Sequence, residues 1–295
     1  MWLSHISLKL VFSRELLEGD CLLLWEKSTL IQKMITFKKV KVCFLLIFIF
    51  FNIFYIAPCY SLSLREDLFQ NALELSSSGK FNLALQEWNQ YLDSYPDDAA
   101  GFSNRGNVRL VVGDVKGSID DQNKAISLNP SAIDPYINRG IAEESLGLWS
   151  EAKKDYMFVI SQDSKNFSAL YNLANVEGST SHWEKARDLF SKAALYNPGF
   201  AMARSSMALA DFQLGNIDEA EKELIKLIRR YPNFADARAA LTALNWSNGE
   251  GGKAESNWIA VTELDPRYSD EEWLKKIRRW PPQPIKDLMN FIDLK

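Results

Sequence analysis

Small and turn-forming residues recur at a fixed step of 34 positions along most of the chain. One ladder consists of Ala84, Ser118, Ala152, Ala186, Ala220 and Ala254. A second holds Gly79, Gly113, Gly147, Gly215 and Gly249, with Ser181 in the fourth place, and a third holds Pro96, Pro130, Pro198, Pro232 and Pro266, with Ser164 as its exception. A period of this length indicates a stacked array, in which each repeat buries its apolar face against its neighbours.

Six repeats fill residues 65–268, and each predicts two helices, A and B, joined by a turn glycine. The repeats are 65–98, 99–132, 133–166, 167–200, 201–234 and 235–268. The middle of helix A carries a small residue in repeats two to five, namely Gly106, Gly140, Ala174 and Ala208. The closing proline ends helix B because it has no N–H and clashes with the preceding turn. The pattern therefore predicts an all-α fold.

The arrangement resembles the tetratricopeptide repeat family. The resemblance implies a right-handed superhelical solenoid of helix-turn-helix repeats, in which the small positions let two antiparallel helices approach closely. It also implies that helix A of each repeat lines a concave groove, with its second, fifth, sixth and ninth positions pointing into it. We call these positions the A-helix face and expect function on a surface, with no reaction catalysed.

Residues 34–61 predict an export segment. Three lysines within residues 38–41 precede an apolar run over residues 42–57, and small residues follow, as in a secretory signal peptide. The run is shorter than the ~20 residues that usually span a bilayer, which favours cleavage, with an uncleaved membrane anchor as the alternative. Either form places the repeats across a membrane. Met34 is the natural start, which makes residues 1–33 an upstream extension.

The charge distribution argues against nucleic acid as a partner. Beyond residue 61 the chain holds 27 Lys and Arg against 34 Asp and Glu, whereas phosphate backbones require clustered basic residues. All three cysteines, Cys21, Cys43 and Cys59, precede the repeats, so we expect neither a disulfide nor a thiolate metal site in the array. No cofactor is expected.

Polar residues recur on the predicted groove face. The sixth positions of repeats one to four are Gln70, Asn104, Asn138 and Asn172, and Asn107 and Asn175 stand at ninth positions. An asparagine side chain has both a donor and an acceptor, so it can pair with a peptide unit without reading the partner's side chain. The array resembles the asparagine ladder of O-linked N-acetylglucosamine transferases, which implies that an extended peptide is the ligand. The alternative is a solvated surface that binds nothing.

Other polar residues favour structural roles over catalysis. We expect Arg105 and Arg139, at seventh positions, to pack their stems between repeats while their charged groups stay in solvent. Carboxylates such as Asp121 lie near the starts of B helices, where the helix dipole explains them. His182 is the single histidine of the array and lies in a turn. No metalloprotease or phosphate-loop motif is present in the sequence.

Residues 269–295 predict C-terminal capping helices. Ser269 and Glu272 have the spacing of a capping box, after which Trp273, Ile277 and Trp280 can share one helical face. The prolines at 281, 282 and 284 then start a second helix, whose apolar residues are Ile285, Leu288, Met289 and Ile292. We expect this segment to cover the apolar end of repeat six; the alternative is a docking helix for a partner.

The layout of residues 34–295, with its Trp280-Pro281-Pro282 corner, resembles exported repeat proteins of cyanobacteria and their plastid relatives. This resemblance implies a periplasmic or thylakoid-lumen protein that helps to assemble photosynthetic complexes. The sequence therefore predicts a non-catalytic scaffold that binds a protein or extended peptide in its groove. The alternative is a structural adaptor that uses its convex face and its ends and leaves the groove empty.

Overall fold

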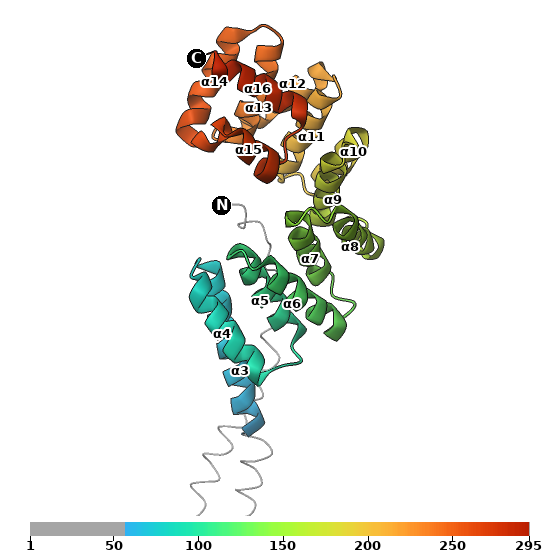
Figure 1. Ribbon diagram of the computed structural model, residues 1–295, viewed down its shortest axis with the longest axis vertical. Coiled ribbons are helices and arrows are strands. Elements are labelled where there is room, and N and C mark those ends of the chain that lie inside the picture. Colours follow the sequence, from blue (N-terminus) through green and yellow to red (C-terminus); the bar gives the residue numbers. More distant parts are fainter. Residues whose placement is uncertain (1–56, 295) are drawn as a thin grey trace, which may run out of the picture. The chain divides into compact units, whose positions relative to one another are not determined.

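The computed structural model describes residues 57–294, with side chains from residue 64 onward, and this part of the chain is all helical (Figure 1). The prediction of an all-α array of helical hairpins is confirmed. No helix among these residues has the length and apolar character needed to cross a bilayer. The predicted export segment lies almost wholly outside them. The chain divides into two compact segments at Ser94 and Tyr95, which are described separately.

The first segment contains α3 (Ala57–Ser77) and α4 (Phe81–Ser94), and α3 begins upstream of the predicted start of repeat one. Its core is aromatic: the ring of Phe69 packs edge-on against Trp88 and Tyr91, with centroids 5.0 and 5.4 Å away. Ala72 and Ala84 are fully buried between the helices. The hairpin therefore has a small core of its own.

The second segment contains five helical hairpins followed by a C-terminal extension. The hairpins are α5 (Ala99–Val111) with α6 (Val115–Leu128), α7 (Asp134–Ser145) with α8 (Trp149–Gln162), α9 (Phe167–Ser179) with α10 (Trp183–Tyr196), α11 (Ala201–Gln213) with α12 (Ile217–Arg230), and α13 (Ala235–Ser247) with α14 (Gly251–Leu264). The extension contains η3 (Pro266–Ser269), α15 (Glu271–Trp273), η4 (Leu274–Arg278) and α16 (Pro282–Asp293). Each predicted repeat thus contributes one hairpin.

The turn between the two helices of a repeat needs a left-handed residue. The five ladder glycines have φ between 73° and 89°, a region in which a Cβ atom is disfavoured. In repeat four Ser181 adopts the same conformation, with φ of 66°. The glycine ladder therefore reflects a backbone requirement, and repeat four meets it with a strained residue.

Close helix packing inside a repeat depends on the small residue of helix A. A Cβ atom on Gly140 would lie 2.7 Å from the ring of Tyr156 on α8, and one on Gly106 would lie 2.7 Å from Nε2 of Gln122 on α6. Tyr156 and Gln122 follow the small-residue ladder by four positions, where the other repeats have large apolar side chains: Trp88, Phe190, Leu224 and Trp258. Each hairpin is thus built around one small and one large side chain.

The C-terminal extension differs in part from expectation. Asp270, and not Ser269, caps α15 by accepting bonds from the N–H groups of Glu272 and Trp273, because Ser269 closes the preceding 3₁₀ turn. Ile277 is exposed and does not share a buried face with Trp280, because residues 274–278 form a π-helical turn. On α16, Ile285, Leu288 and Phe291 pack into the core of repeats five and six.

Candidate binding surface

The sixth-position asparagines of repeats two and three lie on helix A and are mostly buried. Nδ2 of Asn138 donates to Oγ of Ser103 in the preceding repeat, at 3.2 Å, and Nδ2 of Asn104 donates to the carbonyl oxygen of Ala100, at 3.0 Å. Among the described residues no donor reaches Oδ1 of either side chain. The protein therefore fixes both amides and leaves an acceptor on each.

The other predicted groove residues are less uniform. Gln70 belongs to the first segment, is exposed, and donates to Glu66 at 2.7 Å. Asn107 accepts a hydrogen bond from Gln122 at 3.1 Å, and Asn175 is buried beside the hydroxyl group of Tyr171. Asn172 is half-buried. Repeats two and three are thus the part of the second segment in which the asparagine pattern is best ordered.

The expectation that the charged groups of Arg105 and Arg139 stay in solvent was wrong. Arg139 forms a two-point ion pair with Asp155 of its own helix B, at 2.6 and 2.7 Å, and Arg105 forms the equivalent pair with Asp121, at 2.7 and 2.9 Å. Both carboxylates are buried, so Asp121 is a packing residue and not merely a favourable charge at a helix start. The two pairs are related by the repeat. In repeat four the same two positions are Leu173 and Leu189, in the apolar core.

A second recurring ion pair joins neighbouring repeats. Lys153 on helix B of repeat three lies 2.8 Å from Glu177 on helix A of repeat four, and Arg187 lies 3.1 Å from Asp211, one repeat later. Burial by itself would raise the pKa of Glu177, but Lys153 and Lys185 hold it below its ordinary value. His182 contributes to the same turn, with Nδ1 3.0 Å from Oγ1 of Thr180.

The equivalent carboxylate in repeat three lacks the cation from the preceding repeat, although Nε of Arg139 in its own helix lies 3.9 Å away. Glu143 occupies the helix A position of Glu177 and Asp211, but Ile119 stands where repeats three and four have Lys153 and Arg187. Oε2 of Glu143 is buried without a hydrogen-bond partner among the described residues. Burial raises the pKa of Glu143 to about 7, and the negative charge of Asp155 adds to the effect. The missing cation explains why this acid is poorly compensated.

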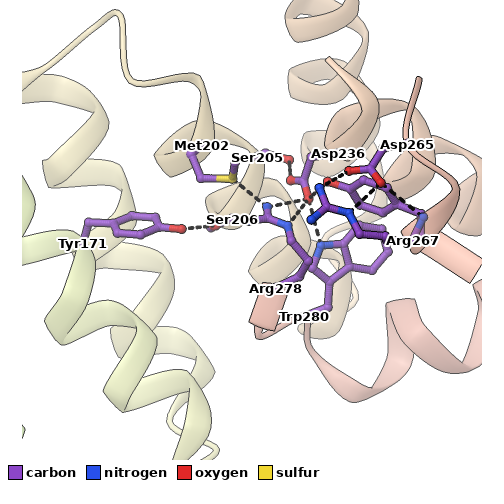
Figure 2. Close-up of polar contacts among 10 residues, drawn as sticks. Tyr171, Met202, Ser205, Ser206, Asp236, Asp265, Arg267, Arg278 and Trp280 are labelled. Carbon is purple, nitrogen blue, oxygen red and sulfur yellow. Dashed lines mark hydrogen bonds and ion pairs between the residues drawn. The ribbon is translucent and has the colours of Figure 1, made fainter. Parts of the chain in front are cut away.

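The most elaborate polar site is centred on Asp236, at the second position of helix A in repeat six. Figure 2 shows the donors that converge on its carboxylate. Ser205 donates to Oδ2 at 2.6 Å, and Oδ1 accepts from Tyr268 at 2.9 Å, from Trp280 at 3.1 Å and from two nitrogens of Arg278, at 2.5 and 3.0 Å. Arg278 and Asp236 are 5% and 1% exposed, respectively.

The electrostatics of this site favour the ion pair. Burial by itself would raise the pKa of Asp236, but Arg278, Ser205 and Trp280 hold it below its ordinary value. Burial also raises the pKa of Tyr268, as does the charge of Asp236, so its hydroxyl group remains a donor. The site is consequently an anionic receptor filled by a guanidinium group at all physiological pH values.

The next residue, Arg279, contacts a buried carboxylate from a different repeat. Its guanidinium group pairs with Glu144 of α7, which also accepts a hydrogen bond from Tyr156, and it lies over the ring of Trp149, 5.7 Å from the centroid. Burial lowers the pKa of Arg279 to about 10, so the group stays charged at neutral pH. A cavity of about 630 Å³ adjoins it, between Trp183 of repeat four and Met289 of α16.

Sequence reasoning missed the residues of this polar site. Asp236 fell on the A-helix face but had no recurring partner, and Arg278 and Arg279 stood in a segment predicted as a cap or a docking helix from its apolar residues. The available signal was the pair of adjacent arginines before Trp280 in an acidic chain. The fold thus defines a helical-hairpin array whose candidate binding surface is the A-helix face.

Comparison with known proteins identifies the class of repeat. Residues 180–244 match the tetratricopeptide repeat family model. Human tetratricopeptide repeat protein 6 is 29% identical over 42% of this chain and 24% of its own length, and zebrafish (Danio rerio) tetratricopeptide repeat protein 36 is 32% identical over 31% of this chain and 51% of its own. The chain therefore spans about a quarter to a half of these relatives.

A solved structure has a similar fold. Pseudomonas aeruginosa pilF superposes with a TM-score of 0.61 over 68% of this chain and 92% of its own, at 16% identity. The array therefore contains a stretch that matches tetratricopeptide repeats, residues 180–244, and a tetratricopeptide repeat fold suggests a scaffold for protein–protein interaction.

Proposed function

We propose that this protein is a non-catalytic scaffold that binds an extended segment of a partner protein on the A-helix face of repeats two and three. The supporting observation is the pair Asn104 and Asn138, one repeat apart, whose Nδ2 atoms are held internally while their Oδ1 atoms accept no bond from the described residues. An extended peptide presents backbone N–H groups that such acceptors can bind without sequence preference. Asn107 and Asn172 extend the track.

The test is a variant in which Asn104, Asn138 and Asn172 are replaced by alanine. Peptides selected on the wild-type chain from a random phage-displayed library should bind the variant at least about tenfold more weakly, as expected for two or three lost hydrogen bonds. Asn257→Ala is the matched control, because Asn257 makes the same internal bond as Asn104, to Lys253, but lies on helix B. Its peptide affinity should be unchanged.

The same experiment separates the proposal from its alternatives. The triple variant should keep its helical content, with a loss of about 1 kcal/mol from the bond between Asn138 and Ser103. A much larger loss of stability would assign the asparagines to packing. Unchanged peptide affinity would favour the structural adaptor, for which Leu195 and Ile259, exposed on the B helices α10 and α14, are candidate contacts.

We further propose that the scaffold works on the far side of a membrane, in a periplasm or thylakoid lumen, and assists the assembly of a membrane complex such as a photosynthetic one. The support is the sequence of residues 34–61, with its lysines and apolar run. Mass spectrometry of the N-terminus after separation of membranes tests this. A soluble form that starts near residue 62 indicates cleavage, and a membrane form with residues 42–57 indicates a tether. A cytosolic protein with its N-terminus intact would refute the location.

A further inference from the structure

The segment of residues 271–283, from α15 to the first turn of α16, contacts both ends of α11 in repeat five. Nη2 of Arg278 lies 2.6 Å from Sδ of Met202, at the second position of α11, and the N–H of Gln283 donates to Oε1 of Gln213, the last residue of α11. The segment therefore runs from one end of α11 to the other. Met202, Ser205 and Asp236 are all positions of the A-helix face. An external peptide would need the same surface.

Two adjacent arginines hold this segment on carboxylates from two different repeats. Arg278 binds Asp236 of repeat six, and Arg279 binds Glu144 of repeat three. Each carboxylate is nearly inaccessible to solvent and also accepts a bond from a tyrosine hydroxyl group, Tyr268 for the former and Tyr156 for the latter. The two sites thus share a carboxylate, a tyrosine hydroxyl group and a guanidinium group, and the Asp236 site adds Ser205 and Trp280 as donors.

These carboxylates would be poorly tolerated without the arginines. A buried carboxylate that loses its cation is strongly destabilising, whereas the planar fork of arginine matches a carboxylate well. The fixed cations near Asp236 come from the C-terminal extension: Arg278 contacts it directly, and Arg267 lies on Asp265 nearby (Figure 2). Repeats three to six therefore contain two receptors for guanidinium groups, one at Asp236 on the A-helix face and one at Glu144, which lies further along its helix A.

We propose that Asp236 and Glu144 form a receptor for an extended segment with two adjacent arginines, and that Arg278 and Arg279 fill it as an intramolecular ligand. A partner that carries adjacent arginines followed by an aromatic residue competes for the same two carboxylates. The proposal rests on the proposed function only in treating the A-helix face as a ligand surface. Asn104 and Asn138 belong to repeats two and three, and the binding of arginine by Asp236 does not depend on them.

The geometry of the segment is suited to displacement. It consists of a three-residue helix and one π-helical turn, and Arg279 adopts left-handed φ and ψ of 53° and 40°. Lys275, Lys276 and Ile277 are exposed on its outer side. Leu274, Arg278 and Trp280 are buried, so displacement must also move these side chains out of the core, but short and strained connections belong to the low-stability end of a fold. The apolar face of α16 can stay packed while the arginines exchange.

The experiment uses the full chain with Arg278→Ala and Arg279→Ala, together with a synthetic peptide of residues 274–284. The variant should bind this peptide at least about tenfold more tightly than a control peptide in which both arginines are alanine, because charge-assisted pairs are lost in the control. The wild-type chain should bind the peptide more weakly than the variant does, since its own segment competes at an effective concentration of about millimolar. A folded variant that binds both peptides equally, or neither, would overturn the proposal.

A second measurement covers the case in which the double variant does not fold. Excess wild-type peptide is added to the wild-type chain and amide hydrogen exchange is followed by mass spectrometry. Exchange in residues 270–281 should accelerate with the arginine peptide and not with the alanine peptide, while exchange in α5 and α6 stays constant. Unchanged exchange in residues 270–281 at saturating peptide would refute displacement. The library peptides that report on Asn104 and Asn138 are unaffected by either result, so the two proposals fail separately.

Discussion

Arg105 holds Asp121 by two hydrogen bonds, from Nε at 2.9 Å and from Nη2 at 2.7 Å, inside repeat two. The same relationship recurs between Arg139 and Asp155 one repeat later, and it joins the two helices of each hairpin. Because Asp121 is buried, its carboxylate stabilises the fold only while it is paired with a guanidinium group.

Removal of one partner should therefore cost more than removal of both. We expect Asp121→Leu to destabilise the protein by about 3 kcal/mol, because it leaves the Arg105 guanidinium group without its carboxylate. The double variant Arg105→Leu with Asp121→Leu should recover part of that loss, since Leu173 and Leu189 occupy the same positions in repeat four. The rest remains because Arg109, whose Nη1 lies 3.0 Å from Asp121, loses this carboxylate in both variants. Urea unfolding of the two variants and the wild type measures the difference. Equal losses in both variants would show that leucine cannot pack in repeat two.

Glu143 should make stability depend on pH. Its pKa of about 7 in the folded state exceeds its ordinary value of 4.5, so the folded state retains a proton that the unfolded state has released. Stability from this group is full below about pH 4.5 and is lost as the pH rises to about 7, by roughly 1–3 kcal/mol. Glu143→Gln should remove this loss and be more stable than wild type at pH 8. Urea midpoints at pH 5 and pH 8 test it.

Two further variants check the cause of that dependence. Ile119→Lys should supply the cation that the neighbouring repeats possess, lower the pKa of Glu143 and flatten the pH profile. Glu184→Gln, at an exposed position on α10, should leave the profile as it is. A wild-type profile that matches that of Glu143→Gln would contradict the prediction.

Gly140→Ala should destabilise repeat three. The new Cβ atom would lie 2.7 Å from two ring carbons of Tyr156, and the ring is fully buried, so the helices must move apart at a cost of about 1–3 kcal/mol. Gly252→Ala is the control: it lies in the first turn of α14 with open space around it, and should be neutral or stabilising by up to about 1 kcal/mol. Thermal unfolding compares the two.

Ser181→Gly should stabilise the turn of repeat four by about 1 kcal/mol, because a non-glycine residue is strained at φ of 66°. The reverse change, Gly147→Ser at φ of 73° in repeat three, should destabilise by a similar amount. Chemical denaturation of the single variants and of the pair measures both effects. If Gly147→Ser destabilises the protein but Ser181→Gly does not stabilise it, Ser181 has contacts that offset its strain.

The periodic part of the structure was predictable because each repeat poses the same packing problem. The glycine ladder required a left-handed turn, and the small residues Gly106 and Gly140 required a close helix pair, so the hairpins followed from spacing alone. Asp270 was harder to identify as a helix cap, because Ser269 and Glu272 had a competing pattern and only the 3₁₀ turn after Pro266 decided between them.

The ion pairs were not predictable from one repeat at a time. Arg105 and Asp121 lie 16 positions apart on two helices, and Arg278 and Asp236 lie 42 positions apart. Their pairing depends on how helices cross and on how the C-terminal extension folds back. The charge of the arginines suggested that they are exposed to solvent. The buried carboxylates that pair with them could be identified only from the folded structure.

The convergence on Asp236 has a consequence for synthesis. Its helix is complete by residue 247, yet three of the side chains that bond to it, Tyr268, Arg278 and Trp280, are translated afterwards. A nascent chain that folds as it emerges therefore carries Asp236 without these three donors until residue 280 has left the ribosome. The hairpin of α13 and α14 completes its polar site only when the C-terminal extension has folded onto it.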